Sequence, residues 1–277
     1  MCAPGWSQNI DQAHTELKPN LAENDNSKVN WPKRILNPVT FSHAGGEIRI
    51  GGCAKGAGMI HPRMATMLSY LTTDATLHPE VLRKAFRKAV EGSFNRISVD
   101  GDTSTNDTCV LMANGAAGLP EIQPGTEAAE SFEKALALLT GHLAREIVRD
   151  GEGATTVVRL DVVRARDDEQ AEKVARAVCN SPLVKCAIHG RDPNWGRILC
   201  AAGYSGAGVM PESVDLSIQN VPVLRRGTPL SFDAPSLSKA MDGEEVTIRL
   251  DLGAGTSSTT FWTCDFSKEY ETINADY

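Results

Sequence analysis

The chain has 277 residues, 41% of them hydrophobic, which allows one large domain or two ordinary domains with a sizeable buried core. Its formal net charge of -7 argues against nucleic-acid binding, which usually needs a basic surface. The same charge does not favour binding to an anionic membrane surface. The sequence contains no run of about 18 apolar residues and so predicts no transmembrane helix.

The seven cysteines are widely spaced and include no CxxC pair. This pattern is neither a disulfide framework nor a metal signature, so we expect free thiols in a reducing compartment and no metal site. The first residues, "MCAPGWSQNIDQAHTELKPNLAENDN", lack the apolar segment of a signal peptide and are too acidic for a transit peptide. The sequence therefore predicts a cytoplasmic protein, with the mitochondrial matrix as the alternative in a eukaryote.

Residues 1–38 are polar and without a clear period, so we expect them to be disordered and the ordered chain to begin near Val39. The alternation in "EIRI" predicts a short strand over Glu47–Ile50, and the glycines of Gly51–Gly58 predict a tight turn. This turn matches neither a phosphate loop nor a dinucleotide-binding motif. Lys55 is therefore either an exposed turn residue or a group that holds a substrate carboxylate.

Helical and strand patterns alternate along the rest of the chain. The predicted helices are His78–Phe94, Thr126–Gly151 and Asp167–Ser181; the predicted strands are Asp107–Asn114, Thr155–Ala165, Val214–Leu224, Glu244–Gly253 and Thr259–Phe266. Because a strict βαβ rhythm is missing, we expect an α/β or α+β fold with layered sheets and a domain boundary near residue 165.

Three polar segments allow both a structural and a functional interpretation. "SVDGDTSTNDT" (Ser98–Thr108) is typical of a hydrogen-bonded loop and lacks the glutamate of a calcium loop. "RDGEGATT" places Glu152 after a helix, where the glycines suffice as a C-cap but the carboxylate could accept a substrate ammonium. "HGRDPNWGRI" (His189–Ile198) indicates packing and turn residues, because no second ligand lies at metal spacing.

Thr66, in "MATML", has two interpretations. One is an ordinary residue at the start of a helix. The other is a nucleophile, which needs an adjacent base. If the Ala65–Thr66 bond were cut, the new α-amine of Thr66, with an ordinary pKa of about 7.7–8.0, would supply that base. Spacing alone leaves both interpretations open.

Five stretches, in order, resemble the glutamate/ornithine N-acetyltransferase family of arginine biosynthesis: "RIGGCAKGAGMIHPRMATMLSYLTTDA", "FNRISVDGDTSTNDT", "AREIVRDGEGAT", "NSPLVKCAIHGRDPNWGRI" and "EYETINADY". The resemblance covers roughly Val39–Tyr277 and leaves residues 1–38 outside it. It implies a layered αββα-type sandwich with an N-terminal-nucleophile-like active site. It also implies a catalytic domain over 39–165 and a smaller C-terminal α/β domain over 166–277.

The resemblance further implies self-cleavage between Ala65 and Thr66 into α and β chains, which assemble into a heterotetramer. Thr66 would take the acetyl group of N-acetylornithine as an ester, release ornithine and pass the acetyl group to glutamate. The same resemblance implies that the substrate is bound by Lys55, Glu152 and Asn274 together with Thr66. No cofactor is implied, and acetyl-CoA stays open as a second acetyl donor.

The sequence departs from the family pattern in several places. The family's Thr-Gly motif, which forms the oxyanion hole, does not occur before Thr66, and Arg63 and Thr156 replace the family's Asn and Lys. The chain stops at Tyr277, where the family usually has two further residues. The resemblance therefore implies a chain that lacks a front segment. An N-terminal-nucleophile amidase or aminopeptidase, and an inactive truncated remnant, are the alternative functions.

Overall fold

The computed structural model describes residues 38–61, 67–104 and 106–275. The chain divides into two compact units. The first comprises Met1–Gly56, Arg63–Asn95 and Ser104–Ile147; the second comprises Ala57–Pro62, Arg96–Thr103 and Val148–Tyr277. No helix of the described residues has both the length and the apolar character needed to cross a bilayer.

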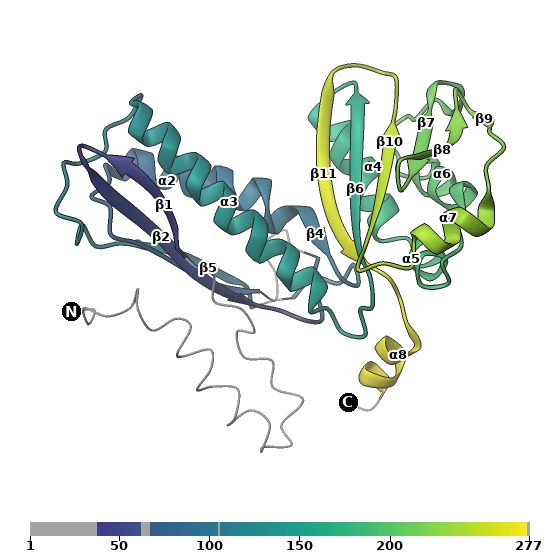
Figure 1. Cartoon of the computed structure of the whole chain (residues 1–277), viewed down its shortest axis with the longest axis horizontal. Helices are drawn as coiled ribbons and strands as arrows, with labels where there is room; N and C mark the ends of the chain where they lie inside the picture. Colours follow the sequence, from purple (N-terminus) through teal and green to yellow (C-terminus); the bar gives the residue numbers. More distant parts are fainter. Residues whose placement is uncertain (1–37, 62–66, 105, 276–277) are drawn as a thin grey trace. The chain divides into compact units, whose positions relative to one another are not determined.

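The first unit is a four-stranded sheet with two long helices (Figure 1). The strands, in the order β1-β2-β3-β5, are β1 (Val39–His43), β2 (Gly46–Lys55), β3 (Leu68–Thr73) and β5 (Thr108–Ala113). β2 pairs antiparallel with β1 and β3, and β3 pairs parallel with β5. The helices are α2 (Pro79–Gly92) and α3 (Glu127–Arg149), whose last residues belong to the second unit.

Local sequence signals set the limits of these helices. His78 accepts the N–H of Glu80 as the N-cap of α2, and Pro79 occupies the first turn, where its missing N–H costs nothing. Val81, Ala85 and Ala89 then recur every four residues and form the buried face of α2. In α3, Phe132 is fully buried and packs edge-on against Phe41 of β1.

A Gly141→Ala variant is expected to stabilise the first unit by about 0.5–1 kcal/mol, because glycine in a helix interior loses more backbone entropy on folding than alanine does. Gly141 lies inside α3, and a Cβ added there meets nothing within 4 Å. Urea denaturation followed by circular dichroism measures the change. A urea midpoint lower than that of wild type would show that the added methyl group is not accommodated.

The second unit is built on a seven-stranded mixed sheet (Figure 1), ordered β4-β11-β6-β10-β7-β8-β9. The strands are β4 (Ile97–Ser98), β6 (Val157–Ala165), β7 (Asp215–Ile218), β8 (Val221–Arg225), β9 (Thr228–Pro229), β10 (Glu245–Asp251) and β11 (Ser257–Cys264). The helices are α4 (Asp168–Cys179), α5 (Pro182–His189), α6 (Trp195–Gly203), α7 (Ala234–Ala240) and α8 (Lys268–Ala275), with short 3-10 turns at Phe94–Arg96 and Pro211–Ser213.

Strand β6 lies at the centre of this sheet and organises its core. It pairs parallel with β10 and antiparallel with β11. Leu160 and Val162 of β6 are fully buried and belong to the same apolar cluster as Val174 of α4 and Ile248 of β10. Buried Val158, Leu160 and Val162 alternate along β6 with half-buried Arg159 and Asp161, so one face of the strand packs into this core.

The expected mixed α/β fold with more than one sheet is confirmed, but two predicted segments differ. The predicted turn Gly51–Gly58 is mostly strand, since β2 continues to Lys55. A Cβ at Gly52 would lie 3.0 Å from the carbonyl oxygen of Tyr70, so this glycine permits close strand packing. The predicted strand Val214–Leu224 is a hairpin of β7 and β8, which turns at Gln219–Asn220 with both residues at positive φ.

The division between the units also differs from the predicted boundary near residue 165. The long C-terminal stretch of the second unit begins at Val148, because β6 pairs with strands that lie far later in the chain. This unit carries seven strands against four in the first, so it is not the smaller one. The predicted disorder of residues 1–38 falls almost entirely outside the described residues.

Candidate functional site

Glu152 and Asn274, which the resemblance assigns to substrate binding, meet in the second unit. The side-chain amide of Asn274 donates to Oε2 of Glu152 at 3.1 Å, across 122 positions of sequence. The same amide donates to the carbonyl oxygen of Tyr270, one turn earlier in α8, at 2.9 Å. Asn274 is exposed and Glu152 half-buried, so a carboxylate and an amide lie together where a small polar molecule can reach them.

The turn that carries Glu152 is fixed from two sides. Its own N–H donates to the carbonyl oxygen of Ala57 at 2.9 Å, and the hydroxyl of Ser267 donates to the carbonyl oxygen of Gly153 at 2.6 Å. A Cβ at Gly58 would lie 2.6 Å from Oε1 of Glu152. A side chain at position 58 would therefore displace this carboxylate.

Asp100 fixes the loop that precedes the Ala65–Thr66 bond in sequence. Its two carboxylate oxygens accept the N–H groups of Met59 at 2.6 Å and Ile60 at 3.0 Å. Met59 has a φ of 51°, in the left-handed region that side chains rarely adopt. The carboxylate therefore compensates for strained backbone with two charge-assisted hydrogen bonds.

Tyr270 lies among acidic groups in this part of the second unit. Burial, followed by the charges of Asp100, Asp102 and Glu152, raises the pKa of the Tyr270 phenol to about 12, and the phenol is hydrogen-bonded to Asp100. It therefore stays protonated at neutral pH and serves as a donor. The surrounding negative charge favours a ligand that carries an ammonium group.

The first unit holds Lys55 and the residues that follow Thr66. Lys55 ends β2 and lies in register with Leu68, the first residue of β3. No carboxylate among the described residues pairs with its ammonium group, which leaves it available to an anionic ligand. Ala65 and Thr66 themselves lie outside the described residues. The described chain resumes at Met67 and enters strand β3 at Leu68.

The peptide group after Thr66 is held firmly. The N–H of Met67 donates to Oδ1 of Asp107 at 2.5 Å, and its carbonyl oxygen accepts the N–H of Thr108 at 2.9 Å. Met67 is 3% exposed, and burial raises the pKa of the Asp107 carboxyl. Met67, which follows the predicted nucleophile in sequence, is therefore anchored through both its backbone N–H and its carbonyl oxygen.

Two of the thiols, Cys109 and Cys179, are not reactive thiolates at neutral pH. All six cysteines of the described residues are free. Burial raises the pKa of Cys109 to about 11 and that of Cys179 to about 12, so both remain protonated at neutral pH. Among these same residues, no three His, Cys, Asp or Glu side chains form a group that could hold a metal ion.

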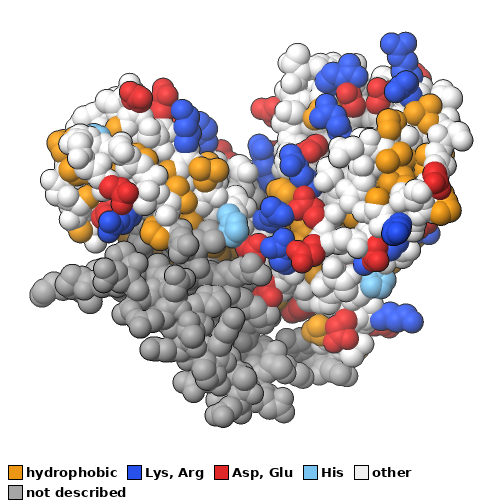
Figure 2. Space-filling model, in the orientation of Figure 1, with side chains coloured by type: hydrophobic (Ala, Val, Ile, Leu, Met, Phe, Trp, Pro, Cys, Tyr) orange, Lys and Arg blue, Asp and Glu red, His pale blue; other side chains and the backbone are white. Residues whose placement is uncertain are grey.

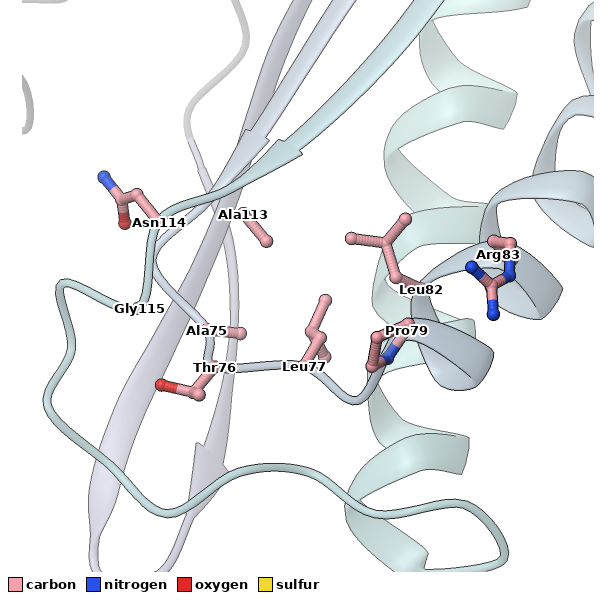
Figure 3. A pocket seen from close by; sticks show the side chains of 9 residues that line it. All are labelled: Ala75, Thr76, Leu77, Pro79, Leu82, Arg83, Ala113, Asn114 and Gly115. Carbon is pink, nitrogen blue, oxygen red and sulfur yellow. The ribbon is translucent and has the colours of Figure 1, made fainter.

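A separate cavity of about 340 Å³ in the first unit contains none of these groups. Figure 3 shows Leu77 and Leu82 pointing into it, whereas Asn114 lies at its rim and points away. Its lining is mostly aliphatic and holds neither a carboxylate nor a cysteine, so it does not fit a zwitterionic ligand. On the face drawn in Figure 2, basic and acidic side chains of the second unit are interleaved.

Asp100, Asp107 and Tyr270 were not singled out by sequence. Asp100 and Asp107 stand in a polar loop that is equally typical of local hydrogen bonding, so their type and spacing carried no functional signal. The one available signal was position: both acids stand in the polar segment between the predicted helix His78–Phe94 and the start of the predicted strand Asp107–Asn114. Tyr270 belongs to "EYETINADY", where only Asn274 was singled out.

Comparisons with known proteins agree with these motifs. A model of the ArgJ family matches residues 7–277, and so includes most of residues 1–38, which the motifs alone placed outside the family. An arginine biosynthesis bifunctional protein ArgJ from Symbiobacterium thermophilum is 48% identical over 84% of this chain and 58% of its own length. The mitochondrial protein of that name from Yarrowia lipolytica is 48% identical over 95% of this chain and 64% of its own length.

One solved structure extends the comparison to the fold. The crystal structure of arginine biosynthesis bifunctional protein argJ from Bacillus halodurans matches with a TM-score of 0.74 and 41% sequence identity. The match covers 76% of this chain and 100% of the solved chain. This chain spans about three fifths of the length of the curated relatives described above.

Proposed function

The chain belongs to the ArgJ family, and from this premise we propose that it is an acyltransferase that moves an acetyl group from N2-acetyl-L-ornithine to L-glutamate in arginine biosynthesis. The observation that carries the proposal is the contact between Glu152 and Asn274. Two residues assigned to substrate by separate motifs are adjacent in space. The acidic groups around Tyr270 suit the ammonium group of an ornithine-like substrate.

In this proposal the reaction begins with self-cleavage of the Ala65–Thr66 bond, which gives Thr66 a free α-amine. The hydroxyl of Thr66 then adds to the acetyl carbonyl while the α-amine accepts its proton and delivers it to the departing nitrogen of ornithine. The acetyl group remains on Thr66 as an ester. The amine of glutamate attacks this ester, takes the acetyl group and restores the hydroxyl.

The remaining residues bind and orient the amino acid. Lys55 pairs with the substrate carboxylate, Glu152 with its ammonium group, and Asn274 holds both Glu152 and substrate through its amide. No cofactor is needed for these steps, and acetyl-CoA is an alternative acetyl donor.

Cleavage after Ala65 would leave fragments of residues 1–65 and 66–277, which intact mass distinguishes. The proposed assembly of α and β chains into a heterotetramer is measurable by light scattering after cleavage.

The deciding experiment supplies N-acetylornithine with and without glutamate and separates the products by chromatography. A transferase makes N-acetylglutamate and ornithine only when glutamate is present. Release of acetate in both reactions would instead identify an amidase. If wild type forms no product from N-acetylornithine or from acetyl-CoA, the chain is an inactive remnant and the proposal fails.

We propose the compartment from the names of two relatives and from the thiols. The Yarrowia lipolytica relative is named mitochondrial, whereas the Symbiobacterium thermophilum relative carries no such word. The described cysteines are free, as expected in a reducing environment. We therefore place the protein in the cytoplasm of a bacterium or the mitochondrial matrix of a eukaryote.

A Gly58→Ala variant is expected to raise KM for N-acetylornithine roughly 10- to 100-fold, because the new methyl group displaces the Glu152 carboxylate. Gly58 does not have a positive φ, so the effect is steric contact with Glu152 rather than backbone strain. Initial-rate kinetics measure it. Gly196→Ala, whose Cβ makes only ordinary contact in the same unit, is the matched control; an equal KM in both variants would contradict the assignment of Glu152.

A further inference from the structure

Asp265 is a fully buried carboxylate that gathers hydrogen bonds in the second unit. Oδ1 accepts the N–H groups of Thr155 at 2.8 Å and Thr156 at 2.9 Å. Oδ2 accepts the hydroxyl of Thr155 at 2.6 Å and Nδ1 of His189 at 2.7 Å, which must donate because a carboxylate only accepts. Burial alone would raise the pKa of Asp265, but these hydrogen bonds hold it below its usual range.

These donors lie next to the turn that carries Glu152. Thr155 follows Glu152 by three residues. Its backbone N–H and its hydroxyl both donate to Asp265, and these two hydrogen bonds hold the end of the Glu152 turn in place. The N–H of Asp265 returns to the carbonyl oxygen of Thr156 at 3.1 Å, which extends the pairing of β6 with β11. One buried carboxylate thus sets where the Glu152 turn leaves the sheet.

Asp265 also begins the segment that carries Asn274. Ser267, two residues later, accepts the N–H of Glu269 at 3.1 Å at the start of α8 and donates to Gly153 in the Glu152 turn. Gly153 has a φ of 66°, and a Cβ there would lie 3.0 Å from Cα of Tyr270. The turn and the helix that hold the two substrate-binding residues therefore approach closely, directly beyond Asp265.

Helix α5 supports the same segment from another side. Lys185 and His189 are one helical turn apart on α5, and both reach residues 263–266. Nζ of Lys185 donates to Oγ1 of Thr263 at 2.8 Å and to the carbonyl oxygen of Cys264 at 2.5 Å, and lies 4.7 Å from the ring centroid of Phe266. Lys185 is 1% exposed, so this contact belongs to the core.

We propose that Asp265 is a positioning residue for the acetyl transfer: with Thr155 and His189 it holds Glu152 and the Asn274 helix in the geometry that binds the amino-acid substrate. The inference rests on the proposed function, because its consequence is the affinity for that substrate. Asp265 does not touch the substrate in this account; it acts through the two residues that do. Its loss should therefore change KM much more than kcat.

The test compares two threonine–aspartate hydrogen bonds of equal length, one just beyond the end of the β6–β11 pair and one within it. Thr155 donates to Asp265 at 2.6 Å, and Thr260 donates to Asp161 at 2.6 Å. Thr155→Val is expected to raise KM for N-acetylornithine about tenfold with kcat within about twofold of wild type, whereas Thr260→Val leaves both unchanged. Self-cleavage, followed by intact mass, should proceed in both variants.

A second variant guards against a folding defect in the first. The side chain of His189 is 40% exposed, so His189→Ala removes one donor to Asp265 with little loss of packing, and a several-fold rise in KM is expected. If wild type transfers acetyl but neither variant raises KM above that of Thr260→Val, the positioning role is overturned. A fall in kcat at unchanged KM would also overturn it. Wild type that makes no N-acetylglutamate would instead defeat the proposed function.

Discussion

A Thr66→Ala variant is expected to remain a single chain and to lose acetyl transfer by at least about 10⁴-fold. Alanine has no hydroxyl to attack the preceding peptide bond, so the α-amine that serves as base is never released. Alanine also lacks the hydroxyl oxygen that would carry the acetyl group as an ester. Denaturing electrophoresis and intact mass measure the cleavage, and N-acetylglutamate formation measures the transfer.

Two controls separate the hydroxyl of Thr66 from other effects of substitution. Thr66→Ser keeps a hydroxyl and should still cleave and transfer, at a lower rate. Thr72→Ala changes a threonine of the adjoining strand β3 and should match wild type. Incubation of wild type with N-acetylornithine alone should leave an acetyl group on the peptide that begins with Thr66. Cleavage in Thr66→Ala would disprove the assignment.

The three helices predicted from sequence, α2, α3 and α4, were placed closely because their signals are local, whereas α5, α6, α7 and α8 were not predicted. The apolar spacing of α2, with His78 and Pro79 at its start, and the Asp167 cap of α4 place both helices within two residues of their predicted limits. The β7–β8 hairpin was missed because its turn is Gln219–Asn220 rather than the Asn-Gly that usually marks such turns. Its two strands therefore resembled one continuous apolar run.

The site was predictable only in part, and for a different reason. Glu152 and Asn274 were identified by motif resemblance, and no periodicity indicates that they meet. The role of Asp100 depends on backbone donors at Met59 and Ile60, about 40 residues away, and that of Asp265 on donors more than 70 residues away. Such roles arise from tertiary pairing, which a single acidic residue after a strand does not reveal.

Asp265→Asn is expected to reduce the free energy of unfolding by about 2–4 kcal/mol at pH 7, because an amide cannot accept four hydrogen bonds as a carboxylate does. The same loss should shrink in acid. The pKa of Asp265 is lower in the folded protein than its unfolded value of about 3.9, so the unfolded chain binds the extra proton first. The stability that this carboxylate contributes is therefore complete above about pH 4 and is lost as pH falls through the folded pKa.

Urea denaturation of wild type and Asp265→Asn between pH 7 and pH 3 measures this difference, with Asp242→Asn as the control. Asp242 is another aspartate, paired with Arg191, but its side chain is 70% exposed. Replacing its carboxylate should therefore cost at most about 0.5 kcal/mol at any pH in the range. The two stability curves should converge in acid for Asp265→Asn. Curves that stay parallel down to pH 3 would show that the pKa of Asp265 is the same in the folded and unfolded protein, and the stabilisation of its ionised form by the four donors would be wrong.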